Sequence, residues 1–177
     1  KSTLQGATDH QDQSKMVPHP RSFRRDRKPT GDIRHKQAPG IKPKDLVGKR
    51  IGTPEYQLTA PVWQRGILSD EYGVPVTSVT HFQGGLEESG REEKVNLDLP
   101  ANIKLSPIPA GKTLSQMLEV GEIDALVSPR SPSSFKPGGK VRRLFEDYAA
   151  VERDYYQRTK IFPVMHVTDK VYVRVIL

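Results

Sequence analysis

A strand pattern that runs directly into a helix pattern, at residues 48–68, constrains the fold more than any other stretch of the sequence. Residues 49–53 predict a short buried strand, and Thr59, Pro61 and Gly73 predict the N-cap, the first turn and the end of the following helix. In open α/β sheets such junctions bind small anions, because free amides at the helix start point into the crevice beyond the strand. Residues at helical spacing should form the inward face of this helix, namely Val62, Trp63, Gly66 and Ile67.

Further strands are predicted along the rest of the chain. Alternating or continuous apolar residues place them at 76–82, 103–108, 123–127 and 161–167, with an irregular, charged stretch at 83–101. Residues 1–40 show no sustained period and are interpreted as a poorly ordered lead-in.

Two more helices are predicted between these strands. The first begins at a capping box, residues 113–116, and ends at Gly121. The second should begin at Asp147 as its N-cap and run through Arg158. Its predicted inward residues are Tyr148, Val151 and Tyr155. The alternation of strands and helices predicts an α/β fold, with a parallel or mixed sheet flanked by helices.

The net charge of +7 is unevenly distributed. Residues 1–50 hold 13 Lys and Arg against 5 Asp and Glu, whereas residues 51–177 hold 15 against 16. The positive charge therefore lies in a Pro-rich, weakly apolar segment and not on a folded face, which argues against nucleic-acid binding. No apolar run approaches the ~20 residues of a membrane helix, so no membrane insertion is expected. The absence of cysteine excludes thiolate chemistry and fits a reducing compartment.

Several catalytic motifs are incomplete. Gly111-Lys-Thr113 resembles the end of a phosphate-binding loop, but Ser106 stands where the first glycine should be, and two prolines remove amides that phosphate would need. The five histidines show no metal-ligand spacing, so no metal site is predicted, although carboxylates from distant positions could still assemble one. A Gly-x-Ser-x-Gly elbow is absent, and the paired glutamates at 87–88 and 92–93 are interpreted as solvated charges.

Three polar features follow predicted strands. Residues 55–59, which include Tyr56, Gln57 and Thr59, offer hydroxyl, amide and backbone donors at a helix start. Ser128-Pro-Arg130 lies at the same sheet edge if the strand before it is parallel. Arg130 is then either a bidentate carboxylate ligand or a surface residue in a turn. His166 ends an apolar strand, where a core or hinge residue is the commoner finding, yet it is the best available proton donor near neutral pH.

A series of short motifs at residues 40–167 has the order and spacing of one enzyme family. In these motifs the chain resembles 4,5-dihydroxyphthalate decarboxylase and its close relatives, which are often labelled as ABC-transporter substrate-binding proteins. The motifs are DLVGKRIGTPEYQLTA (45–60), WQRGIL (63–68), GGLE (84–87), GREEK (90–94), IPAGKTLS (108–115), GEIDAL (121–126), SPR (128–130), YY (155–156) and IFPVMH (161–166).

The resemblance implies a type II periplasmic-binding-protein fold, in which two α/β lobes close over a ligand. It further implies that the chain covers mainly the second lobe, so that we expect an incomplete cleft. Residues 1–40 would be a basic lead-in, 41–130 the α/β lobe, and 131–177 a truncated return segment toward the first lobe.

The activity implied by the resemblance is decarboxylation of 4,5-dihydroxyphthalate to protocatechuate and carbon dioxide, without a cofactor. Chemistry alone suggests the roles. Arg130, with Ser128 and the helix start at Tyr56, Gln57 and Thr59, would hold a carboxylate, while Arg91 is a secondary carboxylate ligand. His166 or Tyr56 would handle protons.

Two alternatives remain open at the level of sequence. The first is a substrate-binding protein of a transporter, which captures a small aromatic or carboxylate ligand without chemistry and shares the fold. The second is a non-functional fragment. An enzyme is expected to be cytoplasmic, and a transport protein periplasmic.

Overall fold

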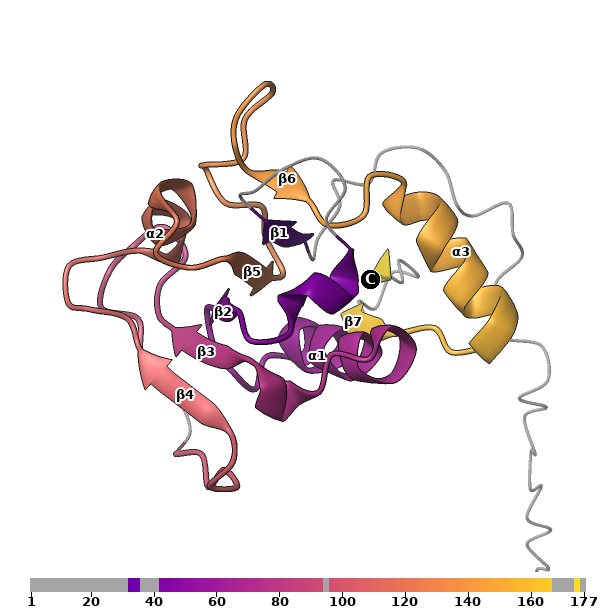
Figure 1. Ribbon diagram of the computed structural model, residues 1–177, viewed down its shortest axis with the longest axis horizontal. Coiled ribbons are helices and arrows are strands. Elements are labelled where there is room, and N and C mark those ends of the chain that lie inside the picture. The colour runs from indigo at the N-terminus through magenta and orange to yellow at the C-terminus, as the bar shows by residue number, and fades with distance from the viewer. Residues whose placement is uncertain (1–31, 36–41, 94–95, 167–173, 176–177) are drawn as a thin grey trace, which may run out of the picture.

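The computed structural model describes residues 32–35, 42–93, 96–166 and 174–175 (Figure 1). A six-stranded sheet lies at its centre, with strands in the order β4-β3-β2-β5-β1-β6. The strands are β1 (Asp32–His35), β2 (Arg50–Thr53), β3 (Thr80–Gln83), β4 (Lys104–Pro107), β5 (Ala125–Ser128) and β6 (Arg142–Arg143), while β7 (Val164–His166) and β8 (Arg174–Val175) form a separate pair. The helices are α1 (Thr59–Tyr72), α2 (Leu114–Val120) and α3 (Tyr148–Thr159), with 3-10 turns η3 (Pro43–Leu46) and η4 (Val76–Ser78).

Four neighbouring strands of this sheet, β4, β3, β2 and β5, are parallel. β1 and β6 extend the sheet in the antiparallel sense. The predicted α/β class, with a parallel to mixed sheet flanked by helices, is therefore confirmed. The strand β1 was not predicted, because it lies in the segment interpreted as a lead-in.

The two faces of the sheet carry separate apolar clusters, because side chains alternate along each strand. Ile51, Ala125 and Val127 pack with Leu68 of α1 and with residues of the turns around the sheet. Leu126 faces the other way and packs with Leu114, Met117, Leu118 and Ile123 at α2. Figure 1 shows α2 on one side of the sheet and α1 with α3 on the other. Each fully buried leucine contributes about 2 kcal/mol to folding.

Gly52 explains how closely α2 approaches the sheet. A Cβ atom at this position would lie 2.6 Å from Ile123 Cδ1 and 2.8 Å from Leu114 Cδ2. The strand β2 thus has a glycine where the opposite layer needs the space of a side chain.

The predicted ends of the helices are largely confirmed. Thr113 caps α2 by accepting a bond from the amide of Gln116 at 3.3 Å, and Asp147 caps α3 by accepting one from Ala150 at 3.0 Å. Gly73 and Gly121 end their helices in the left-handed conformation. These contacts satisfy backbone groups that a helix end would otherwise leave unpaired.

The start and the inward face of α1 were predicted wrongly. Leu58 is the N-cap, and Thr59 is already the first helical residue. The buried residues are Ala60, Pro61, Gln64 and Leu68, while Val62 is 48% exposed. The buried face contains Gln64, a polar residue that does not fit an apolar spacing pattern. The apolar pattern therefore indicated the neighbouring face of the helix.

Three strands begin two or more residues later than predicted, and the strand predicted from Ile123 begins at Ala125. The differences are larger for the other two. Residues 76–78 form the turn η4, in which the Ser78 hydroxyl bonds the carbonyl of Pro75 at 2.6 Å, so that β3 begins only at Thr80. Short polar side chains often favour such local bonds over strand pairing. The last predicted strand begins at Val164 and not at Ile161, because Pro163 lacks an amide for the ladder. Val167 lies outside the described residues.

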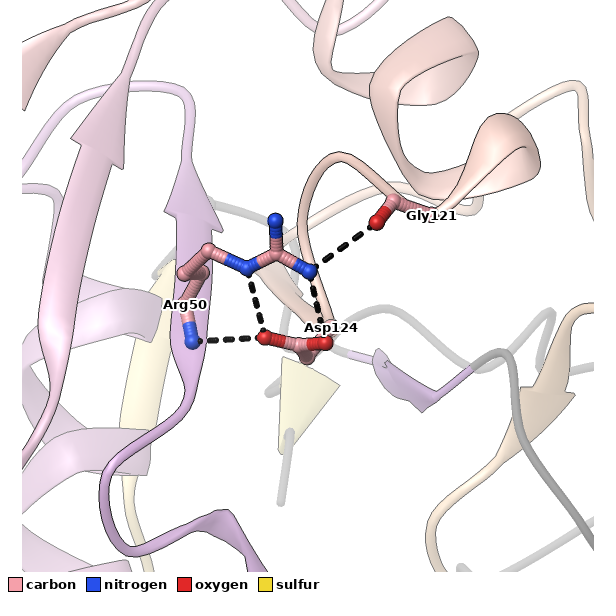
Figure 2. Close-up of polar contacts among 3 residues, drawn as sticks. All are labelled: Arg50, Gly121 and Asp124. Carbon is pink, nitrogen blue, oxygen red and sulfur yellow. Dashed lines mark hydrogen bonds and ion pairs between the residues drawn. The ribbon is translucent and has the colours of Figure 1, made fainter.

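The amino edge of the parallel strands is joined by the ion pair of Arg50 and Asp124 (Figure 2). Arg50 donates from Nε and Nη2 to the two carboxylate oxygens, at 2.9 Å each, and from Nη2 to the carbonyl of Gly121 at 3.0 Å. Asp124 also accepts from the Arg50 amide at 3.0 Å. These donated bonds hold the pKa of the Asp124 carboxyl below its usual range. Together they fix β2 against the turn before β5.

Candidate functional site

The carboxyl edge of the parallel strands collects most of the predicted site residues. The register sets Gly52 opposite Leu126, and Thr53 opposite Gln83. Ser128, two residues beyond Leu126, therefore ends at the same edge as Thr53. This confirms that the Ser128–Arg130 segment lies beside the junction of β2 with α1. Open α/β sheets bind their ligands at such an edge.

The junction after β2 is fixed by a buried carboxylate. Thr53 donates its hydroxyl hydrogen to the carbonyl of Glu55 at 3.1 Å. Glu55 is 3% exposed, and its carboxylate accepts a bond from Arg91 Nε at 2.7 Å as well as one from Arg91 Nη2. Arg91, a predicted ligand of the substrate carboxylate, thus already holds a carboxylate of the protein.

Tyr56 is packed between one side chain of α1 and one of β3. The guanidinium carbon of Arg65 lies 3.7 Å from the centre of its ring, and the His81 ring meets it edge-on at 5.1 Å. Arg65 also donates from Nη2 to the Tyr56 carbonyl at 2.7 Å. Burial raises the pKa of the Tyr56 phenol above its ordinary value, although the charge of Arg65 opposes this. The phenol is therefore protonated at neutral pH.

The segment after β3 reaches back to the same junction through Glu93. Its Oε2 atom accepts a bond from the Tyr56 amide at 2.7 Å. In the amide orientation that satisfies both of its polar atoms, Gln83 donates to the same oxygen and accepts from the Glu93 amide, at 3.1 Å each. Glu55, Arg65 and Glu93 were missed as site residues. The partners of Glu55 and Glu93 lie 36 and 37 positions away in the sequence, so no local pattern indicates them.

Arg130 differs from Arg91 in having a guanidinium that remains available. The Arg130 amide donates to the hydroxyl of Ser128 at 3.2 Å, and Ser128 is 0% exposed. The guanidinium itself is exposed and forms no hydrogen bond or ion pair with any residue that the structure describes. Gln57 and Thr59 are likewise exposed, at the start of α1.

His166 lies on a different sheet. It ends β7, where it is paired with Arg174 of β8. Its side chain is outside the described part of the structure. Strand pairing therefore does not bring His166 to the edge that carries Ser128 and Tyr56, and its predicted role remains a prediction.

The described residues form neither a metal site nor a membrane-spanning helix. Within the described ranges, no three His, Asp or Glu side chains are placed to hold a metal ion. No helix in those ranges is both long enough and apolar enough to span a bilayer.

Comparison with known proteins finds relatives that share one name. No family model matches the chain. The chain is 48% identical over 125 residues to the 4,5-dihydroxyphthalate decarboxylase of Comamonas testosteroni, a match that covers 70% of the chain. It is also 48% identical over 114 residues to the enzyme of the same name from Pseudomonas putida, covering 64% of the chain. Over these residues the chain is similar to the 4,5-dihydroxyphthalate decarboxylase family.

The match to the 4,5-dihydroxyphthalate decarboxylases covers only part of each relative. The matched region is 38% of the Comamonas testosteroni protein and 44% of the Pseudomonas putida protein. The matched part of the chain thus corresponds to less than half of each decarboxylase. Its arrangement is consistent with part of a periplasmic-binding-protein-like fold.

Proposed function

We propose that this protein takes part in the decarboxylation of 4,5-dihydroxyphthalate, and that the carboxyl edge of its sheet holds the substrate. The observation that carries the proposal is the 48% identity over 125 residues to a protein of that name. The alternative of a transport protein that binds without chemistry has no comparable support among the relatives found.

The reaction itself defines what the site must provide. A proton is added to the ring carbon that carries one carboxylate, and the hydroxyl para to that carbon supplies electron density to the ring. The C–C bond then breaks, its electrons restore the aromatic ring, and carbon dioxide leaves. The protein must therefore hold the remaining carboxylate, place a proton donor near the ring carbon and stabilise phenolate character.

Arg130 is the proposed ligand for the carboxylate that stays on the ring. Its guanidinium is exposed and unpaired among the described residues, whereas its main chain is fixed to the buried Ser128. A guanidinium binds a carboxylate through two parallel hydrogen bonds. Gln57 and Thr59, at the start of α1, would add polar contacts at the same edge.

The remaining roles are divided between three residues. Tyr56 would act as a hydrogen-bond donor, because burial raises its pKa and keeps the phenol protonated. His166 is the proposed proton donor. Arg91 would act indirectly, because its contact with Glu55 fixes the junction next to Tyr56. A cytoplasmic location is part of this proposal, and cell fractionation tests it.

Binding of 4,5-dihydroxyphthalate, measured by calorimetry, tests the carboxylate role. Arg130→Ala should weaken binding at least tenfold, since a charged hydrogen-bonded pair contributes about 1.5–3 kcal/mol. Arg153→Ala is the matched control, because Arg153 is an exposed arginine on α3. Equal binding by the two variants would remove Arg130 from the site.

A further inference from the structure

The loop that carries Arg130 is held at both of its ends. At its start, the Arg130 amide bonds the Ser128 hydroxyl at 3.2 Å. At its end, Glu87 accepts two bonds from Ser133, one from the amide at 2.7 Å and one from the hydroxyl at 2.6 Å. Glu87 comes from the segment after β3, 46 positions away in the sequence. The pair therefore joins the loops that follow β3 and β5.

A second bond closes the same end of the loop from α2. The Ser134 amide donates to the Ser115 hydroxyl at 3.1 Å, and the Ser115 and Ser133 hydroxyl oxygens are also 3.1 Å apart. Ser115 is 2% exposed and Ser134 is 5% exposed. Ser115 thus holds Ser133 and Ser134 from the buried side, while Glu87 holds Ser133 from the exposed side.

The backbone that presents Glu87 is itself fixed. The carbonyls of Gly85 and Leu86 accept bonds from the amides of Leu114 and Ser115, at 2.9 and 3.0 Å. A Cβ atom at Gly85 would overlap the main-chain oxygen of Glu88, so this turn has a single close geometry. The backbone next to Glu87 is therefore held in place, although the Glu87 side chain is exposed.

We propose that Glu87 is a positioning residue for Arg130, an inference that rests on the proposed function. Among the described residues the Arg130 side chain has no partner, while hydrogen bonds hold its main chain on both sides. Pro129 and Pro132 further restrict the backbone of this loop. Such a loop loses little freedom when its guanidinium takes a carboxylate, so that more of the interaction energy appears as affinity. Removing the bonds between Glu87 and Ser133 frees the loop at one of its two ends.

Electrostatics alone predicts the opposite effect on substrate affinity when Glu87 is replaced. Loss of a negative charge near the edge should strengthen the binding of a dicarboxylate, since the like charge would no longer repel the ligand. Glu87→Gln keeps the size of the side chain, removes that charge and weakens its contacts. Weaker binding by this variant therefore indicates positioning, which outweighs the charge effect.

The matched control is Glu88→Gln. Glu88 is the next residue, exposed like Glu87, and its side chain makes no hydrogen bond or ion pair with a described residue. Both variants lose one negative charge at neighbouring positions. They differ in the two bonds to Ser133.

The first measurement needs no ligand. Amide hydrogen exchange of Arg130, Ser133 and Ser134 is compared in the unmodified chain, Glu87→Gln and Glu88→Gln. Glu87→Gln should exchange roughly three- to tenfold faster at Ser133 and Ser134, in line with the loss of charge-assisted bonds, while Glu88→Gln leaves these rates unchanged. Equal exchange in both variants overturns the inference whatever the proposed function proves to be.

The second measurement is a double-mutant cycle on 4,5-dihydroxyphthalate binding, with the melting temperature as a check on folding. Glu87→Gln should bind roughly three- to tenfold more weakly than the unmodified chain, and add less than about twofold when Arg130→Ala is already present. Additive effects of the two substitutions overturn the positioning role. If Arg130→Ala alone leaves the affinity for 4,5-dihydroxyphthalate unchanged, the proposed carboxylate role of Arg130 is wrong. The positioning role of Glu87 is then wrong too, even if Glu87 still slows amide exchange in the loop.

Discussion

Arg91 bonds the buried carboxylate of Glu55 across 36 positions of sequence, with its Nε atom 2.7 Å from Oε1. The side chain of Glu55 is 4% exposed and that of Arg91 is 39% exposed. The contact holds the segment after β3 over the junction of β2 with α1, beside the edge proposed to bind substrate.

Arg91→Ala should lower the free energy of unfolding by about 2–3 kcal/mol, because it leaves a buried charge unpaired and the pair is only partly shielded from water. The control is Lys112→Ala, which breaks an ion pair with Glu122 whose side chains are 43% and 39% exposed. That substitution should change stability by less than about 1 kcal/mol. Urea unfolding measures both, and equal losses would contradict the structural role given to Glu55.

His81 predicts a pH dependence of stability. It is 1% exposed, and burial lowers its pKa to about 4. Below the ordinary histidine pKa of about 6.5, His81 becomes protonated in the unfolded chain but stays neutral in the folded chain. The free energy of unfolding should thus fall as the pH drops from about 6.5 to about 4, by about 2–4 kcal/mol in total.

His81→Gln should remove this slope, because glutamine does not titrate. Urea unfolding at several pH values compares its slope with that of the unmodified chain. The carboxylates contribute to both proteins below pH ~5, so the interval from pH 5 to 6.5 is decisive. Parallel curves for the two proteins in that interval would show that His81 is not buried as the neutral form.

Two glycines should respond to alanine in opposite directions. Gly66 lies inside α1, and no atom of a described residue outside the helix backbone lies within 4 Å of a Cβ atom placed there. Gly66→Ala should therefore stabilise the protein by about 0.5–1 kcal/mol through helix propensity. At Gly85 the new atom would overlap the Glu88 carbonyl, and Gly85→Ala should destabilise by about 2 kcal/mol or more. Thermal unfolding of both variants checks the signs, and a neutral Gly85→Ala would contradict the close turn before Glu87.

Gln64 should limit stability. It is 3% exposed, and neither amide atom finds a hydrogen-bond partner among the described residues. Its side chain lines a cavity of about 30 Å³ between α1 and α3, together with aromatic residues that include Tyr72 and Tyr155. Gln64→Met should stabilise the protein by about 1 kcal/mol, because an unpaired buried amide costs about 1–3 kcal/mol.

The control for this substitution is Gln116→Met, on the exposed side of α2. It should change the free energy of unfolding by less than about 0.5 kcal/mol. A destabilised Gln64→Met would indicate that the amide has a polar partner, such as a buried water molecule.

The sequence was sufficient to predict the alternation of strands and helices and the sheet edge that we propose to bind substrate. Short-range features determine the strand predicted at Lys49–Thr53 and the helix caps at Thr113 and Asp147. Their roles can therefore be predicted from neighbouring residues in the sequence. The parallel strand order then placed Ser128 beside the junction at Thr53.

The contacts that fix this edge could not be predicted in the same way. The sequence predicts a solvated charge at Glu87, yet Glu87 bonds Ser133, and Glu93 bonds the amide of Tyr56. Both partners lie dozens of residues away, and no local pattern encodes such a pairing. The inward face of α1 was missed for a related reason, since Gln64 is buried against the preference of its side chain.

Release of carbon dioxide from 4,5-dihydroxyphthalate tests the central claim most directly. The chain is assayed alone and joined to the part of the Comamonas testosteroni decarboxylase that it does not match. We predict that the joined protein releases one carbon dioxide per substrate and forms protocatechuate, and that Arg130→Ala slows this release by about 100-fold or more. Binding of 4,5-dihydroxyphthalate without any release of carbon dioxide would contradict the account and point to a transport protein.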